Sequence, residues 1–210
     1  MILTEVGEIG VHAGEALHVL RPSLYAMSRI GSPAEIVAVY AAVMVDAPAV
    51  IDALGVVYAC CDDDLTDIFG HVEAAADGGG LTYVPGRAPV EHVVHIARCL
   101  LKHGVTGALP ELPRRPDDEP EYVKEFDARA HVAMAMAHLG MSEREAWNIT
   151  MTALVGALRA KFPRPESNSP GARAPTKEEH LATMEWFDRV EAARAKKQEN
   201  ANRRGSMAVK

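Results

Sequence analysis

The stretch Phe162-Pro163-Arg164-Pro165-Glu166-Ser167-Asn168-Ser169-Pro170-Gly171 divides this chain of 210 residues in two. Its three prolines remove backbone N–H donors and its other residues favour turns, so neither a helix nor a strand can continue through it. Beyond it, Thr176-Lys177-Glu178-Glu179 has the pattern of a capping box that opens a charged helix to about Lys197. We therefore predict a body over 1–162, a Pro/Ser-rich linker over 163–175, a C-terminal helix over 176–198 and a disordered basic tail over 199–210.

The first part of the body is predicted to be a β-hairpin. Between residues 5 and 21 apolar residues alternate, so that Ile9 and Val11 share one face, and Leu17 and Val19 share one face after a turn at Ala13-Gly14. An isolated hairpin is only marginally stable in water. We therefore expect it to pack on helices or to pair with the edge of another subunit.

The rest of the body is predicted to be helical. Ser32-Pro33-Ala34-Glu35 is a capping box with proline at the first helical position, and it opens a helix to about Val45. Further helices are expected over 49–61, over about 65–76 after Asp62–Asp64, and from Pro89 to His103 with Gly104 as a left-handed cap. The fold class is therefore mainly α: a helical body with a small N-terminal β-hairpin, followed by a linker and a detached C-terminal helix.

Two later segments complete the body. Residues 126–139 are apolar on most sides, which predicts a buried central helix. After the capping box Ser142-Glu143-Arg144-Glu145, a second helix carries Trp147, Met151, Leu154 and Leu158 in one apolar row. That row is either part of the core or an open groove for an apolar helix of a partner. Burying a leucine contributes about 1.5–3 kcal/mol in either case, so only its exposure in the free protein decides.

Composition excludes several classes of function. The net charge of −7 argues against nucleic acid as the main partner, because phosphate binding requires a basic surface. No apolar run approaches the roughly 20 residues of a membrane span, and the first residues lack the pattern of a signal peptide. Cys60, Cys61 and Cys99 show no disulfide spacing and suit a reducing compartment. We expect a protein of the cytoplasm that binds neither nucleic acid nor membrane.

Candidate catalytic and metal sites are weak in this sequence. His92, His95, Cys99 and His103 share one side of a helix, but positions eleven residues apart lie about 16 Å apart along its axis, too far for one ion. Asp62-Asp63-Asp64 lacks the spacing of a calcium loop and is interpreted as helix capping, and Asp77-Gly78-Gly79-Gly80 lacks the lysine of a phosphate loop. No nucleophile motif is present. We expect no catalysis, no metal and no cofactor. A metal-dependent enzyme is the least favoured alternative.

Apolar residues in the C-terminal helix suggest binding instead. Trp186 and Phe187 are far in sequence from the predicted core, and a tethered helix with aromatic residues more often contacts a partner than encloses a substrate. Together with the apolar row of the body, the predicted partner contacts are Trp147, Met151, Leu154, Leu158, Leu181, Met184, Trp186 and Phe187.

The order of these parts resembles a known family. A short hairpin, then Leu20-Arg21-Pro22-Ser23-Leu24, then Leu139-Gly140-Met141-Ser142-Glu143-Arg144-Glu145-Ala146-Trp147 and Met151-Thr152-Ala153-Leu154, is similar to the tail assembly chaperones of long-tailed bacteriophages. The resemblance covers roughly residues 5–162 and is strongest to phage and prophage proteins of unassigned function.

This resemblance implies a role without catalysis. Such chaperones coat the long helical tape measure protein in the host cytoplasm, keep it soluble and give way as tail tube subunits polymerise around it. It implies the tape measure protein as the partner, allows contact with the tail tube protein, and allows a homo-oligomer. The alternative from another class is a structural virion component, a tail connector or terminator subunit, in which the 5–21 hairpin joins a neighbour's sheet in a ring.

Overall fold

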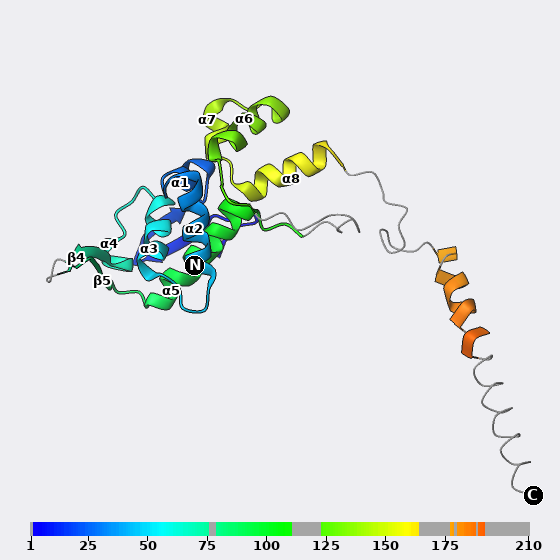
Figure 1. Ribbon diagram of the computed structural model, residues 1–210, viewed down its shortest axis with the longest axis horizontal. Helices are drawn as coiled ribbons and strands as arrows, with labels where there is room; N and C mark the ends of the chain where they lie inside the picture. Colours follow the sequence, from blue (N-terminus) through cyan, green and yellow to red (C-terminus); the bar gives the residue numbers. More distant parts are fainter. Residues whose placement is uncertain are drawn as a thin grey trace, which may run out of the picture. The chain divides into compact units, whose positions relative to one another are not determined.

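The computed structural model describes residues 2–75, 79–110, 123–163 and 177–191, apart from 179 and 188. The chain divides into two units, 1–163 and 164–210, close to the boundary predicted from the prolines after Phe162. The first unit is a mainly helical body with a small antiparallel sheet at its N-terminus (Figure 1). The predicted fold class is therefore confirmed. The predicted linker over 163–175 lies, apart from Pro163, outside the described residues, as does the tail over 199–210.

The N-terminal sheet has three strands in the order β1-β2-β3, all antiparallel: β1 (Ile2–Leu3), β2 (Ile9–Ala13) and β3 (Ala16–Leu20). Ile9 pairs with Leu20 and Val11 with His18, so these residues share the face that packs on the core. Leu17 and Val19 lie on the other face and are exposed. The predicted hairpin and its turn are confirmed, and β1 adds a short third strand.

Four helices follow: α1 (Leu24–Ser28), α2 (Pro33–Met44), α3 (Val50–Ala59) and the single turn α4 (Thr66–Phe69). The first three contact one another, and their buried residues share one core with those of the sheet. The predicted capping box opens α2, because the Ser32 backbone N–H donates to Glu35 Oε2 at 2.7 Å. At the other end of α2, the Arg98 guanidinium donates to the backbone oxygens of Val43 and Val45 at 2.9 and 2.5 Å. These bonds satisfy carbonyls that the helix itself leaves unpaired.

A second hairpin replaces most of the helix predicted after Asp62–Asp64. It consists of β4 (His71–Ala74) and β5 (Leu81–Val84), and lies at one end of the body (Figure 1). Gly70 ends α4 with φ +86°, and its carbonyl accepts the Tyr58 hydroxyl at 2.6 Å. The predicted helix over 65–76 was wrong because Val72, like Leu65 and Ile68, suits either period, and only Gly70 permits the turn out of the helix.

The helix predicted from Pro89 is α5 (Val90–Leu101), which continues as a π-helical segment, η1 (Lys102–Thr106). The prediction that Gly104 caps this helix was wrong, since Gly104 lies inside η1 and the positive φ of +75° belongs to Gly107. Gly104 has another reason to lack a side chain, because a Cβ there would lie 2.6 Å from Met27 Sδ. The glycine allows α1 to approach η1 closely.

The body ends with α6 (Ala128–Leu139), α7 (Glu143–Asn148) and α8 (Met151–Lys161). The predicted capping box at Ser142 is confirmed by reciprocal bonds with Glu145. The prediction that 126–139 is a buried central helix was wrong. Only Ala128, Val132 and Ala135 of α6 are buried, while Met134 and Met136 are exposed. Short alanines and flexible methionines are tolerated on an exposed helix face, so an all-round apolar pattern misled here.

Gly70, at the base of the second hairpin, provides a stability test. In Gly70→Ala, the new Cβ would lie 2.1 Å from the Val84 carbonyl oxygen at a φ that disfavours any side chain. We expect the free energy of unfolding to fall by at least about 2 kcal/mol, measured by urea denaturation. The control is Gly55→Ala in α3, where a Cβ meets nothing within 4 Å and should stabilise the helix by up to about 1 kcal/mol. Equal effects of the two substitutions would contradict this account.

Candidate partner-binding surfaces

The predicted apolar row of the body is divided between two helices. Trp147 belongs to α7, which ends at Asn148, whereas Met151, Leu154 and Leu158 belong to α8. Thr150 separates them, because its side chain accepts the backbone N–H of Ala153 at 3.2 Å and so begins the new helix. The prediction of one continuous helix through all four residues was therefore wrong.

Burial distinguishes these four residues. Met151 is 7% exposed and Leu154 is 0% exposed, and both belong to the hydrophobic core. Leu158 and Trp147 are half-buried at its margin. By the criterion of exposure in the free protein, Met151 and Leu154 are core residues and present almost no surface to a partner.

Trp147 lies in a surface groove that the sequence did not reveal. Its ring contacts that of Tyr25 edge to face, with centroids 6.3 Å apart and planes at 86°. The groove has a volume of about 570 Å³ and is lined by Tyr25, Ser28, Asp62, Arg129, Arg144, Trp147 and Asn148. We call it the Tyr25–Trp147 groove. Its walls are α1, the loop after α3 that carries Asp62, and the consecutive helices α6 and α7. Because α1 lies far in sequence from α6 and α7, no local pattern could have predicted the groove.

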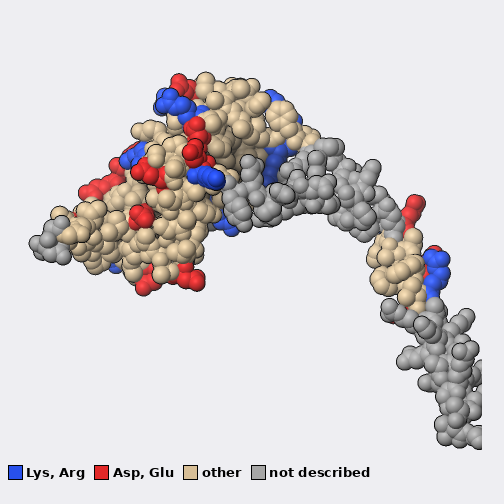
Figure 2. Space-filling view, in the orientation of Figure 1, with Lys and Arg blue, Asp and Glu red and all other residues tan. Residues whose placement is uncertain are grey.

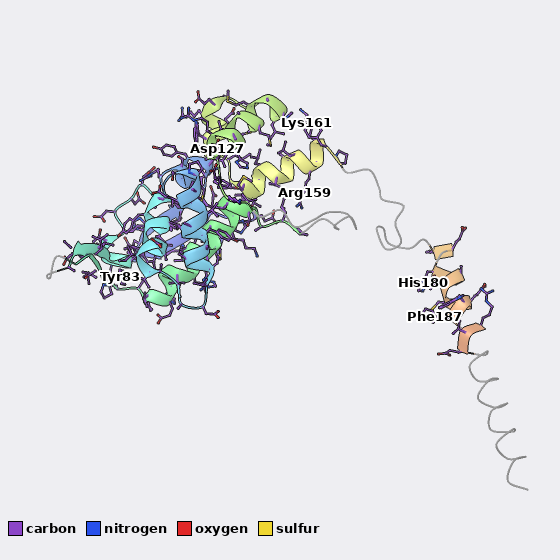
Figure 3. The ribbon with its side chains drawn as sticks, in the orientation of Figure 1. Tyr83, Asp127, Arg159, Lys161, His180 and Phe187 are labelled. Atoms are coloured by element: carbon purple, nitrogen blue, oxygen red, sulfur yellow. The ribbon has the colours of Figure 1, made fainter. Side chains whose placement is uncertain are left out.

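The C-terminal helix exposes all four of its predicted contact residues. Residues 177–191 are helical where they are described, and the rest of the predicted helix over 176–198 lies outside the described residues. Leu181, Met184, Trp186 and Phe187 are 62%, 49%, 53% and 52% exposed. At about 100° per residue, Leu181, Met184 and Phe187 share one side, while Glu185 and Arg189 lie opposite Phe187. His180 and Phe187 are labelled on this helix in Figure 3.

The Trp186 and Phe187 rings contact each other, with centroids 5.2 Å apart and planes at 72°. An exposed helix with an apolar side and a charged side is the form in which helices bind grooves or other helices. Large exposed apolar side chains that adjoin one another are a feature that interaction surfaces commonly have.

The histidines and cysteine that share one side of α5 do not converge on one point. His92 and His95 line an apolar cavity of about 420 Å³ together with His12 and Phe69. Cys99 faces a different hollow, beside Tyr40 and Lys102, and His103 is buried. Among the described residues, no group of three or more His, Cys, Asp or Glu side chains is arranged to hold a metal ion.

The aspartates after α3 each have a separate partner. Asp64, next to the cap residue Leu65, accepts the Thr66 N–H at 2.9 Å. Hydrogen bonding with Thr66, first with its side chain and then with its backbone, lowers the pKa of the Asp64 carboxyl. Asp62 pairs with Arg29 and Asp63 with His18, both at 2.8 Å. The neighbouring Cys60 thiol is buried, which raises its pKa far above the ordinary value, so it is not a reactive thiolate.

His103, in η1, has a buried titratable side chain that joins three parts of the body. Its Nδ1 lies 2.9 Å from Thr152 Oγ1, whose hydroxyl also accepts the Ala108 backbone N–H at 2.9 Å. Gly7 lies against its ring, since a Cβ there would be 2.3 Å from His103 Cβ. Burial first, and then the positive charge of Lys102, lower the pKa of His103 below its ordinary value of 6.5.

This burial predicts a pH dependence of stability. The folded chain disfavours protonated His103. The contribution of neutral His103 to the free energy of unfolding is therefore full above pH 6.5 and is lost as the pH falls through 6.5 toward the lowered pKa of the folded state. We expect His103→Asn to cost roughly 1–2 kcal/mol at pH 7.5 and to flatten the pH profile of unfolding free energy below 6.5. The matched substitution His92→Asn, at an exposed position of α5, should leave the profile unchanged. An unaltered profile in His103→Asn would refute the assignment.

Comparison with known proteins adds one finding. A family model described as a family of unknown function (DUF6246) matches residues 45–182, from the end of α2 into the C-terminal helix. No curated protein and no solved structure matches the chain. Within the part of the chain that the structure describes, no helix is long and apolar enough to cross a membrane.

Proposed function

We propose that this chain, which belongs to the DUF6246 family, is a tail assembly chaperone of a long-tailed bacteriophage. It binds and solubilises the tape measure protein in the host cytoplasm during tail assembly, and it catalyses no reaction. The proposal is supported by the resemblance of residues 5–162 to such chaperones and by the apolar surfaces described above.

The observation that carries the proposal is the set of large apolar residues that the C-terminal helix exposes. Leu181, Met184, Trp186 and Phe187 expose large side chains, and none of them belongs to the hydrophobic core of the body, which residues 9–158 form. Burying each of them against a partner would contribute about 1.5–3 kcal/mol before the cost of association is subtracted. A surface of this kind is suited to cover an apolar helix of another protein.

The charge of the chain suits the same role. A long, partly apolar helix aggregates when its surface is bare, because exposed apolar patches associate. A chain with a net charge of −7 that covers such a helix adds repulsion between the covered molecules. Methionines such as Met184, Met134 and Met136 adapt to varied apolar partners because their side chains are flexible.

Residues 139–147, one of the segments that resemble the tail assembly chaperones, have a clear local role. Gly140 ends α6 in the left-handed region, at φ +70°, and the Ser142–Glu145 capping box begins α7 two residues later. This turn sets the direction of α7 and so presents Trp147 beside Tyr25. The resemblance therefore lies in residues that position a surface aromatic side chain, which fits a binding function.

Co-expression with the neighbouring tape measure gene tests the proposal. With the wild-type chain, we expect the tape measure protein to stay in the soluble fraction and to co-purify. Substituting Leu181, Met184, Trp186 and Phe187 together by serine should reduce the co-purified amount by roughly tenfold or more, because the apolar contacts are lost. The control replaces Glu178 and Glu185, on the charged side of the same helix, by serine.

The control should retain the tape measure protein, and circular dichroism should show an intact body in both variants. If the tape measure protein is equally soluble and unbound without this chain, the proposed function is wrong. If all variants bind it equally, the C-terminal helix is not the contact.

A second candidate function is a structural virion component, a tail connector or terminator subunit. It is favoured by the outer face of the N-terminal sheet, where Leu17 and Val19 are exposed, and by β3, which pairs with β2 alone among the described strands. A neighbouring subunit could extend the sheet at that edge.

Purified mature particles distinguish the two functions. The chaperone function predicts that mass spectrometry finds this chain in assembly intermediates and not in mature particles. Stoichiometric amounts in mature particles would instead establish the structural function.

A further inference from the structure

The Tyr25–Trp147 groove has an unusual balance of charge for an acidic chain. Over α7, basic and acidic side chains lie close together at the surface of the body (Figure 2), so their pairing decides which charged groups are left to bind a ligand. Two arginines line it, Arg129 from α6 and Arg144 from α7, against the single carboxylate of Asp62.

The carboxylates around the groove are already engaged. Asp62 pairs with Arg29 at 2.8 Å. Asp127 accepts the backbone N–H groups of Arg129 and Ala130 at the start of α6, at 2.9 and 3.2 Å. Glu145 belongs to the capping box of α7, and Glu143 accepts the indole N–H of Trp147 at 3.4 Å. These four acids therefore have other partners.

The two guanidinium groups have no such partner. Within the described residues, neither the Arg129 nor the Arg144 side chain makes an ion pair or a hydrogen bond. Arginine beside tyrosine and tryptophan is the combination most enriched where interfaces gain their binding energy. Tyr25 is 55% exposed and presents its ring to the groove. The groove thus offers two free cations and an aromatic surface.

We propose that the Tyr25–Trp147 groove binds an acidic amphipathic helix of the partner protein. Carboxylates of that helix pair with Arg129 and Arg144, and an apolar side chain of it packs against the Tyr25 and Trp147 rings. The walls of the groove are themselves helices, and a groove between helices accepts a further helix laid along it. This inference rests on the proposed function, because it names the kind of segment by which the partner is recognised.

Other ligands fit the groove less well. Two free cations on a chain of net charge −7 are too few to hold a nucleic acid backbone. A small anion would need an enclosed site, whereas Arg129 and Arg144 are both exposed. A protein segment that combines carboxylates with an apolar anchor uses both features of the groove.

Binding of synthetic peptides to the full chain tests this inference. Three labelled helical peptides of about 18 residues are compared by fluorescence polarisation: an acidic amphipathic helix, the same helix with Lys in place of Glu, and the acidic helix with Ala at its apolar positions. The overall charge of the chain favours the basic peptide, so a preference for the acidic amphipathic one can only come from a local basic site. We expect that preference, and we expect it to weaken with salt.

Matched charge reversals locate the site. Arg144→Glu should weaken binding of the acidic amphipathic peptide roughly tenfold, and the double variant with Arg129→Glu should abolish it. Arg87→Glu changes the net charge equally at an exposed position before α5 that does not line the groove, and should change affinity less than about twofold. Circular dichroism of each variant checks that it is folded.

Two outcomes overturn the inference: a basic peptide that binds at least as well as the acidic one, or equal effects of Arg144→Glu and Arg87→Glu. Either can occur while the tape measure protein still co-purifies through the C-terminal helix, in which case only the inference fails. Conversely, the acidic peptide can bind the groove while the tape measure protein is equally soluble and unbound with and without this chain. In that case the groove binds an acidic helix as inferred, and the proposed function is wrong.

Discussion

The structure depends on the burial of the apolar side of α5. Val93, Ala97, Leu100 and Leu101 are completely buried, and α5 packs along α3, whose Ala53, Val56 and Val57 are equally buried. Few core residues are aromatic, so close packing of medium-sized side chains must supply the stability that large rings provide elsewhere. The helix α2 contacts both members of this pair, α1 contacts α3, and η1 continues α5 toward α8. Buried residues of the sheet belong to the same core. Elements distant in sequence are thus brought together around one helix.

This arrangement separates the core from the surfaces that we assign to binding. All members of the hydrophobic core lie between residues 9 and 158, and polar junctions such as His103–Thr152 hold its edges. No described residue of the C-terminal helix is a member of this core. The Tyr25–Trp147 groove forms where α1, α6 and α7 meet at the margin of the core, so its aromatic rings are anchored and still reach solvent. A stable body with anchored and tethered apolar surfaces is suited to cover a partner.

Much of the fold could be predicted because its signals are local. Capping boxes at Ser32 and Ser142 begin helices by hydrogen bonds within four residues, and the alternation over 9–20 determines a hairpin. The prediction failed where a signal was compatible with two structures. The second hairpin depends on Gly70, whose positive φ is visible only in three dimensions, and the break at Thr150 separates Trp147 from Met151 although both fit one helical period. The groove depends on the Tyr25–Trp147 contact and on Arg129 lining the same hollow, and no sequence period relates these positions.

The central claim is that the body is a complete folding unit that leaves the C-terminal unit free to bind. The most direct measurement is thermal unfolding of a chain truncated after Pro163, compared with the full chain by calorimetry. The account predicts that both melt cooperatively at temperatures within about 2 °C of each other, because the core ends before the truncation. A truncated chain that is unfolded, or that melts more than about 10 °C lower, would show that the C-terminal helix belongs to the core and would contradict the account.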